Sequence, residues 1–288
     1  MSITTNCMTV NLSLGIWQGY RLDKAASKKV TDDAGAEADA ARVNKHLIPK
    51  ESLKDIVAMS GQIRQHFYSK TLPWKDNGDR LLTRKLYAPF VETHQALVGE
   101  FRTAVEDFLS KTYPQAKMRA EFRMGDLFNP ADYPASSELR HKFYVALDID
   151  AVSEAKDFRV ALDKESVATI RSDIETATNE RLEKAMRSVW ERLAQTVGHF
   201  AEKMAGDSVF RDSTITNLEE LIDLLPGLNI TADPNLTAVY EDLRRTLIGY
   251  DPKDLRKEPT VRYEAASEAQ RIMQEMTGFM SAFGEAAE

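Results

Sequence analysis

Cysteine is almost absent from this chain, because Cys7 is the single one among 288 residues. One thiol cannot form an internal disulfide, which is compatible with a reducing compartment. The opening residues MSITTNCMTV lack the basic and apolar segments of a signal peptide. The chain also lacks a run of about 18 apolar residues, so neither a membrane span nor a membrane partner is expected. Together these absences predict a cytoplasmic protein.

Glycine is missing between Gly125 and Gly198, and proline is missing between Pro134 and Pro226. Because these residues weaken or break helices, their absence favours a long helix, which we place at residues 163–205 with Asp163 as its N-cap. Apolar or small side chains recur there about every 3.7 residues, which predicts a nearly straight helix with one apolar seam. The seam consists of Val167, Ile170, Ile174, Thr178, Leu182, Ala185, Val189, Leu193, Val197, Phe200 and Met204.

Residues 8–22 and 142–150 alternate apolar and polar side chains with the period of a β-strand, and the simplest sheet pairs the two segments. Residues 51–69 and 90–112 carry apolar stripes at helical spacing. We therefore expect a mainly α fold, in which a long central helix is accompanied by helical hairpins and a small antiparallel β element. We divide it into residues 1–205, an α-rich domain with a two-stranded β element and the long helix, and residues 206–288, a smaller helical region.

Recognisable site chemistry is scarce in this sequence. The five histidines are scattered, and no pair of them has the spacing of a metal site on one helix face. Glycine-rich phosphate loops and nucleophile motifs are missing as well. We therefore predict no catalytic, metal-binding or cofactor-binding residue and no cofactor. The nearest approach to catalytic chemistry is Asp148 with Asp150 on one strand face, since two-metal nucleases use strand carboxylates in this way.

A segment that combines basic and aromatic residues stands out from the acidic average of the chain, whose net charge is −7. Residues 111–144 hold six basic and four acidic side chains, interleaved with aromatic ones. Basic residues beside exposed aromatic rings suit the binding of single-stranded nucleic acid. The candidate contacts are Lys117, Arg119, Phe122, Arg123, Arg140 and Lys142.

The last predicted helix, at residues 261–283, carries a stripe of methionine, phenylalanine and isoleucine. The stripe has two interpretations: it packs into the core, or it forms a docking surface for a partner or a second copy, because methionine-rich faces adapt to partners. The residues concerned are Ile272, Met273, Met276, Phe279, Met280 and Phe283.

Two further motifs, GIWQGY at residues 15–20 and KTLPWKDNGDRLL at residues 70–82, suggest a family. Over roughly residues 1–200 the chain resembles a family of bacteriophage and proteobacterial proteins. Their genes often lie beside those of a MoxR-type AAA+ ATPase and a cobaltochelatase-like protein with a von Willebrand A-like domain. The resemblance implies a phage or bacterial-cytoplasm origin and work beside an ATPase. It implies no catalytic residues, because the family has none established.

These observations favour a non-enzymatic interaction or assembly protein from a phage. Its partner would be itself, as a homo-oligomer, or an AAA+ ATPase for which it serves as an adaptor. The alternative is a single-stranded nucleic-acid-binding protein of phage DNA metabolism. A nuclease or other hydrolase is a third class, which depends on Asp148 and Asp150 alone.

Overall fold

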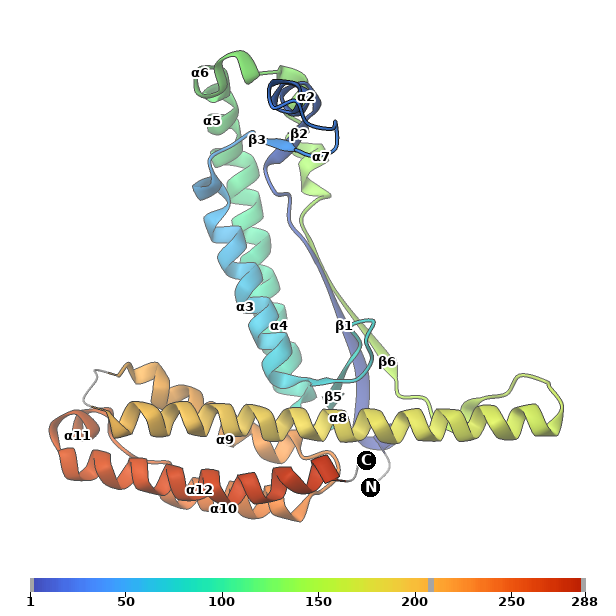
Figure 1. Ribbon diagram of the computed structural model, residues 1–288, viewed down its shortest axis with the longest axis vertical. Helices are drawn as coiled ribbons and strands as arrows, with labels where there is room; N and C mark the ends of the chain where they lie inside the picture. Colours follow the sequence, from blue (N-terminus) through green and yellow to red (C-terminus); the bar gives the residue numbers. More distant parts are fainter. Residues whose placement is uncertain (1–2, 207–209, 286–288) are drawn as a thin grey trace. The chain divides into compact units, whose positions relative to one another are not determined.

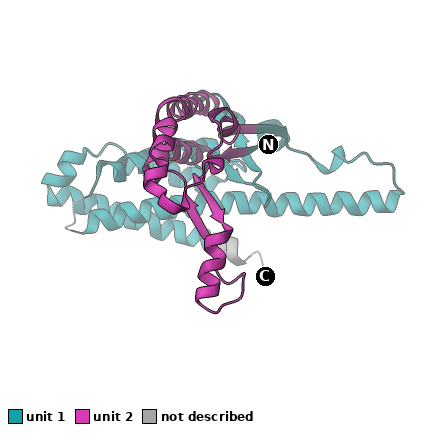
Figure 2. Ribbon diagram, turned by 90° about the horizontal axis from the view of Figure 1, so that it is seen from above, with its two compact units in different colours: residues 1–11, 68–89, 148–288 teal, residues 12–67, 90–147 magenta. Residues whose placement is uncertain are grey.

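The computed structural model of the chain describes residues 3–206 and 210–285, with side chains described up to residue 280. The fold is mainly α with a small antiparallel sheet, as the sequence predicts. Grouping by contacts divides it into two units. Unit 1 comprises residues 1–11, 68–89 and 148–288, and unit 2 comprises residues 12–67 and 90–147 (Figure 2). The predicted boundary after residue 205 is not one of these division points.

The strands form one sheet of four strands, in the order β4-β5-β1-β6, and a separate antiparallel pair, β2 with β3. The strand bounds are β1 (Cys7–Gly15), β2 (Tyr20–Asp23), β3 (Val43–His46), β4 (Leu72–Pro73), β5 (Arg80–Thr83) and β6 (Tyr144–Ala151).

The two predicted strands are neighbours in the sheet, as expected, because β6 lies beside β1. The prediction of a two-stranded element was wrong, since β5 and β4 extend the sheet. Both are short, and Leu81 and Leu82 in β5 are both fully buried, so this segment shows no apolar–polar alternation. The predicted first strand also ends earlier, at Gly15, and the chain turns through Gly19 at φ +66 before β2.

Unit 2 has a core between α3 and α4, which run side by side in Figure 1. Ile56 and Ile63 of α3 pack in one cluster with Phe101 and Val105 of α4. The helices that lie wholly or partly in this unit are α2 (Lys24–Asp33), η1 (Lys50–Leu53), α3 (Lys54–Lys70), α4 (Arg84–Asp107), the π-turn η2 (Phe108–Thr112), α5 (Tyr113–Met118), α6 (Ala120–Met124), η3 (Gly125–Leu127), η4 (Pro130–Asp132) and α7 (Ser136–Arg140).

Unit 1 is built around α8 (Lys164–Ala205), a single helix of 42 residues. Figure 1 shows α9 and α12 beside its C-terminal half. The other helices of the unit are α1 (Ile3–Asn6), η5 (Ala155–Asp157), α9 (Asp212–Leu228), α10 (Pro234–Thr246), α11 (Pro252–Lys257) and α12 (Pro259–Glu285). The C-terminal helices thus share one core with α8.

The predicted N-cap of the long helix is confirmed, because Asp163 accepts a hydrogen bond of 2.8 Å from the backbone N–H of Ser166. The predicted seam divides into two parts. From Ala185 to Met204 its members are buried, whereas the part from Val167 to Leu182 is only half-buried. No residue of α8 before Ala185 is fully buried, so the N-terminal half of the helix contributes little to the core.

Candidate functional site

The most exposed large apolar side chain among those described belongs to Phe122 in unit 2, at 97% exposure. Met118, four residues earlier, is 77% exposed. We call the segment Tyr113–Met124, which comprises α5 and α6, the α5–α6 tip. Apolar groups of this size normally gain about 1.5–3 kcal/mol on burial, so this exposure marks a surface available to a partner.

The local sequence explains why Phe122 faces solvent. Ala120 at the start of α6 is fully buried and packs in a small cluster with Leu47 and Tyr133. Gly125 ends the helix with φ +51, a left-handed conformation that glycine adopts without strain. Since Ala120 holds the inner face of this five-residue helix, Phe122 is left on the outer face.

Hydrogen bonds anchor the tip to the rest of unit 2. The Arg123 guanidinium donates to the His46 carbonyl, and Lys117 Nζ donates to the Tyr133 carbonyl at 3.3 Å. Tyr133 in turn donates its hydroxyl to the Leu47 carbonyl at 3.0 Å. Arg119 differs, because its side chain has no hydrogen bond or ion pair to any residue that the structure describes. Arg119 is therefore the cation of the tip that is most available to a ligand.

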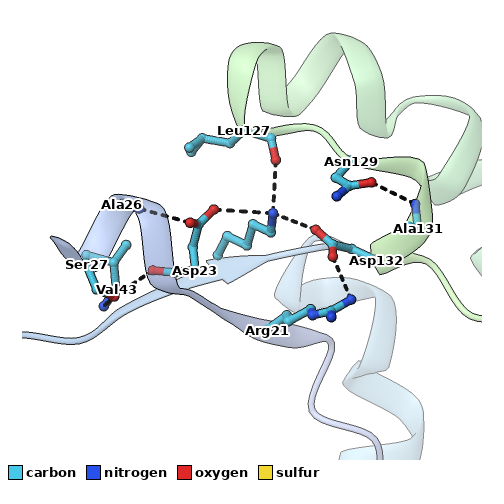
Figure 3. A network of polar contacts seen from close by, with 10 residues as sticks. Arg21, Asp23, Ala26, Ser27, Val43, Leu127, Asn129, Ala131 and Asp132 are labelled. Carbon is cyan, nitrogen blue, oxygen red and sulfur yellow. Dashed lines mark hydrogen bonds and ion pairs between the residues drawn. The ribbon is translucent and has the colours of Figure 1, made fainter. Parts of the chain in front are cut away.

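A charged network connects the strands of the β2–β3 pair to the loop after α6 (Figure 3). Lys45 Nζ lies 2.5 Å from Asp132 Oδ2 and 3.3 Å from Asp23 Oδ2, and it donates to the Leu127 carbonyl. Arg21 contacts the other oxygen of Asp132 at 2.6 Å. The hydrogen bond with Asp132 raises the pKa of Lys45. The pKa of Asp23 is lowered, first by the hydrogen bond that it accepts from the backbone N–H of Ala26 and second by the one from Lys45. This network holds η3 and η4 against β3.

The structure thus places four of the six predicted nucleic-acid contacts on the α5–α6 tip, namely Lys117, Arg119, Phe122 and Arg123. The other two lie elsewhere: Arg140 is on α7, where its guanidinium forms a two-point ion pair with Glu106, and Lys142 is exposed in the turn that follows. The sequence interpretation also missed Met118. Its spacing of four residues from Phe122 was the available signal.

The predicted docking stripe on α12 belongs largely to the core of unit 1. Ile272 and Met276 are fully buried, and Met273, Phe279 and Met280 pack against the same core while partly exposed. The side chain of Phe283 lies outside the described residues. Phe279 also lines an open groove of about 390 Å³ with Leu182 and Met186 of α8. Core packing therefore accounts for Ile272 and Met276.

The third function class, a nuclease or other hydrolase, depends on the carboxylates of Asp148 and Asp150. Asp150 lines a polar pocket of about 650 Å³ in unit 1, together with Asp79, Glu154 and Asp157. Asp79 is already bound by Asn11 and Lys75, and these contacts hold its pKa below the usual range. Within residues 3–206 and 210–285, no three His, Cys, Asp or Glu side chains are arranged to hold a metal ion.

Comparisons of the chain with protein-family models, curated proteins and solved structures found no match. In the part of the chain that the structure describes, every helix is too short or too polar to cross a membrane.

Proposed function

We propose that this protein is a non-enzymatic interaction protein that contacts its partner through the α5–α6 tip. The observation that carries the proposal is the 97% exposure of Phe122, beside Met118 at 77%. A partner that covered these two side chains would gain their burial energy, and aromatic anchors of this kind often dominate the affinity of an interface.

The surroundings of Phe122 indicate what kind of partner fits. Arg119 and Arg123 flank it on the same short segment, so a partner with an acidic rim around an apolar pocket would be complementary. The family resemblance suggests a phage or bacterial protein in the host cytoplasm that acts as an adaptor to an AAA+ ATPase or as a homo-oligomer. The half-buried N-terminal part of α8 supports assembly, because its seam from Val167 to Leu182 retains apolar area that a partner can cover.

The experiment compares wild type with Phe122→Ala and with Tyr263→Ala as a matched control. Tyr263 is an aromatic residue on α12 that is 73% exposed, so its removal tests exposure alone. Light scattering after size exclusion measures self-association, and binding of a purified MoxR-type AAA+ ATPase measures the adaptor role. We expect Phe122→Ala to weaken whichever association occurs by roughly tenfold or more, and Tyr263→Ala to leave it unchanged.

Two results would contradict the proposal. If the wild-type protein stays monomeric at high concentration and does not bind the ATPase, both proposed partners, a second copy of the chain and the ATPase, are ruled out. Equal losses in Phe122→Ala and Tyr263→Ala would show that the tip has no special role.

Single-stranded nucleic-acid binding is the second candidate function, and the accessible ring of Phe122 next to Arg119 favours it. A base can stack on such a ring while the guanidinium contacts a phosphate, and stacking contributes about 1–3 kcal/mol per base. Fluorescence anisotropy with a labelled single-stranded oligonucleotide at low salt tests it. We expect Phe122→Ala and Arg119→Glu each to reduce the affinity by roughly tenfold, with the Tyr263→Ala control unaffected. If wild type does not bind at low salt, this function is excluded.

A further inference from the structure

Two arginines of unit 1, which sequence reasoning did not single out, converge on one backbone carbonyl. Arg80 of β5 donates from Nε to the Thr71 hydroxyl at 2.7 Å and from Nη2 to the Thr71 carbonyl at 2.9 Å. Arg192 of α8 donates from its own Nη2 to the same carbonyl at 2.7 Å, and from Nη1 to the Ser69 carbonyl at 3.3 Å. A shared acceptor oxygen brings the two guanidinium groups close together.

Neither arginine has a carboxylate partner among the side chains that the structure describes. Within residues 3–206 and 210–280, no Asp or Glu oxygen forms an ion pair with Arg80 or Arg192, although both side chains are mostly covered. Burial lowers the pKa of Arg80 to about 10, with the charge of Arg192 as the second cause, and burial also lowers the pKa of Arg192. Two like charges are thus held together where a neutralising group would be favourable.

Capping of α3 explains part of this arrangement. Ser69 lies in the last turn of α3, where the carbonyl groups lack helical partners and carry about half a negative charge in total. The two guanidinium groups bring two full positive charges to this position. A structural role in capping therefore accounts for the hydrogen bonds and leaves most of the positive charge without compensation.

Each guanidinium retains a donor nitrogen without a partner among the described residues. Arg80 Nη1 and Arg192 Nε have no hydrogen-bond partner among the described residues, and both side chains are partly exposed. The guanidinium of Arg80 also lies over the ring of Tyr68 at 4.9 Å, and Tyr68 is 52% exposed. This stacking holds the plane of the guanidinium and fixes the directions of its free donors.

We propose that Arg80 and Arg192 form a binding site for the terminal phosphoryl group of a phosphate monoester. A guanidinium N–H donates well to an oxygen of phosphate or carboxylate, and the two groups together supply two positive charges. A phosphate monoester carries close to two negative charges at neutral pH and so matches the pair, whereas a carboxylate or a phosphodiester carries one. The site lies in unit 1 and is independent of the α5–α6 tip.

Isothermal titration calorimetry of the full chain with inorganic phosphate tests this site, at an ionic strength held constant with sodium chloride. Sodium acetate, a nucleoside monophosphate and an oligonucleotide without terminal phosphate are titrated in parallel. We expect saturable binding of phosphate and of the nucleoside monophosphate, and no saturable binding of acetate or of the oligonucleotide at this site. Arg80→Gln and Arg192→Gln should each weaken phosphate binding by roughly tenfold or more, because each removes charge-assisted hydrogen bonds.

Two further variants separate binding from folding. Arg171→Gln removes one exposed positive charge from the same helix, α8, and should change phosphate affinity less than about twofold, since exposed charges interact weakly. Arg80→Lys keeps the charge but loses the fork, and should also weaken binding while its thermal unfolding stays cooperative. The proposal is overturned if wild type shows no saturable phosphate binding, if acetate or the oligonucleotide binds as well as phosphate, or if Arg171→Gln weakens binding as much as Arg192→Gln.

Discussion

Lys45 and Asp132 form an ion pair of 2.5 Å, and their side chains are only 9% and 6% exposed. Lys45 comes from β3 and Asp132 from η4, so the pair joins two segments that are distant in the sequence. Removing one partner of such a pair leaves the other charge covered and poorly compensated, which costs more than the pair contributes when intact.

Asp132→Asn should therefore destabilise the protein. We expect a loss of about 2 kcal/mol in the free energy of unfolding, because Asp23 still contacts Lys45 and limits the cost. Urea unfolding followed by circular dichroism measures the change. The control is Asp32→Asn, which breaks an exposed i,i+4 pair with Lys28 and should cost less than about 0.5 kcal/mol. Equal effects of the two variants would argue against a special role for the Lys45 network.

His94 should make the stability of the protein depend on pH near neutrality. It is 6% exposed, and burial, followed by the charge of His66, lowers its pKa in the folded state. The unfolded chain then binds a proton more readily than the folded one, so stability is present above the unfolded pKa of about 6.5 and is lost as the pH falls below it. We expect urea midpoints to decrease between pH 7.5 and 5.5, and this decrease to be smaller in His94→Gln. An unchanged decrease in the variant would assign it to other groups.

Gly227 should not tolerate a side chain. A Cβ at this position in α9 would lie 2.7 Å from Cδ2 and Cγ of Leu86, which is too close for a normal contact. Gly227→Ala should therefore lower the free energy of unfolding by about 1–3 kcal/mol through overpacking. Gly99→Ala on α4 is the control, because nothing lies within 4 Å of its added Cβ and alanine favours a helix over glycine. A stabilising effect of both variants in thermal unfolding would contradict this prediction.

Asp233 serves two elements of unit 1. It is the N-cap of α10, where Oδ1 accepts from the N–H of Asn235 at 2.9 Å, and its Oδ2 accepts from the indole N–H of the fully buried Trp190 at 3.2 Å. Asp233→Ala should cost about 2 kcal/mol, because it removes a cap and leaves a covered indole N–H without its partner. Asp251→Ala, which removes only the cap of α11, should cost about half as much. Thermal unfolding of both variants makes the comparison, and equal losses would show that the contact with Trp190 adds nothing.

Much of the secondary structure follows from local sequence. Three local features are sufficient to predict α8. They are the period of the seam from Ala185 to Met204, the N-cap Asp163, and the absence of glycine and proline up to Gly198. The alternation in β1 and β6 is similarly local. By contrast, β5 holds two adjacent buried leucines, Leu81 and Leu82, so no period marks it as a strand and only pairing with β1 reveals it.

The candidate site was predictable only in part. The mixture of basic and aromatic residues drew attention to Phe122 and Arg119, because composition is visible in a sequence. The exposure of Phe122 was not predictable, since it depends on the burial of Ala120 against Leu47 and Tyr133. The ion pair of Arg140 with Glu106 likewise depends on the packing of α7 against η2, the π-turn that follows α4.

By itself, the sequence determined the long helix, its N-cap and the one side on which its apolar seam lies, because these depend on side chains within a few turns of each other. Only the tertiary structure decided which half of that seam is buried, and which cations have partners. Lys45 meets two carboxylates, whereas Arg80 and Arg192 meet each other at Thr71. The physical reason is that burial and charge compensation depend on contacts between residues far apart in the chain, which no local pattern records.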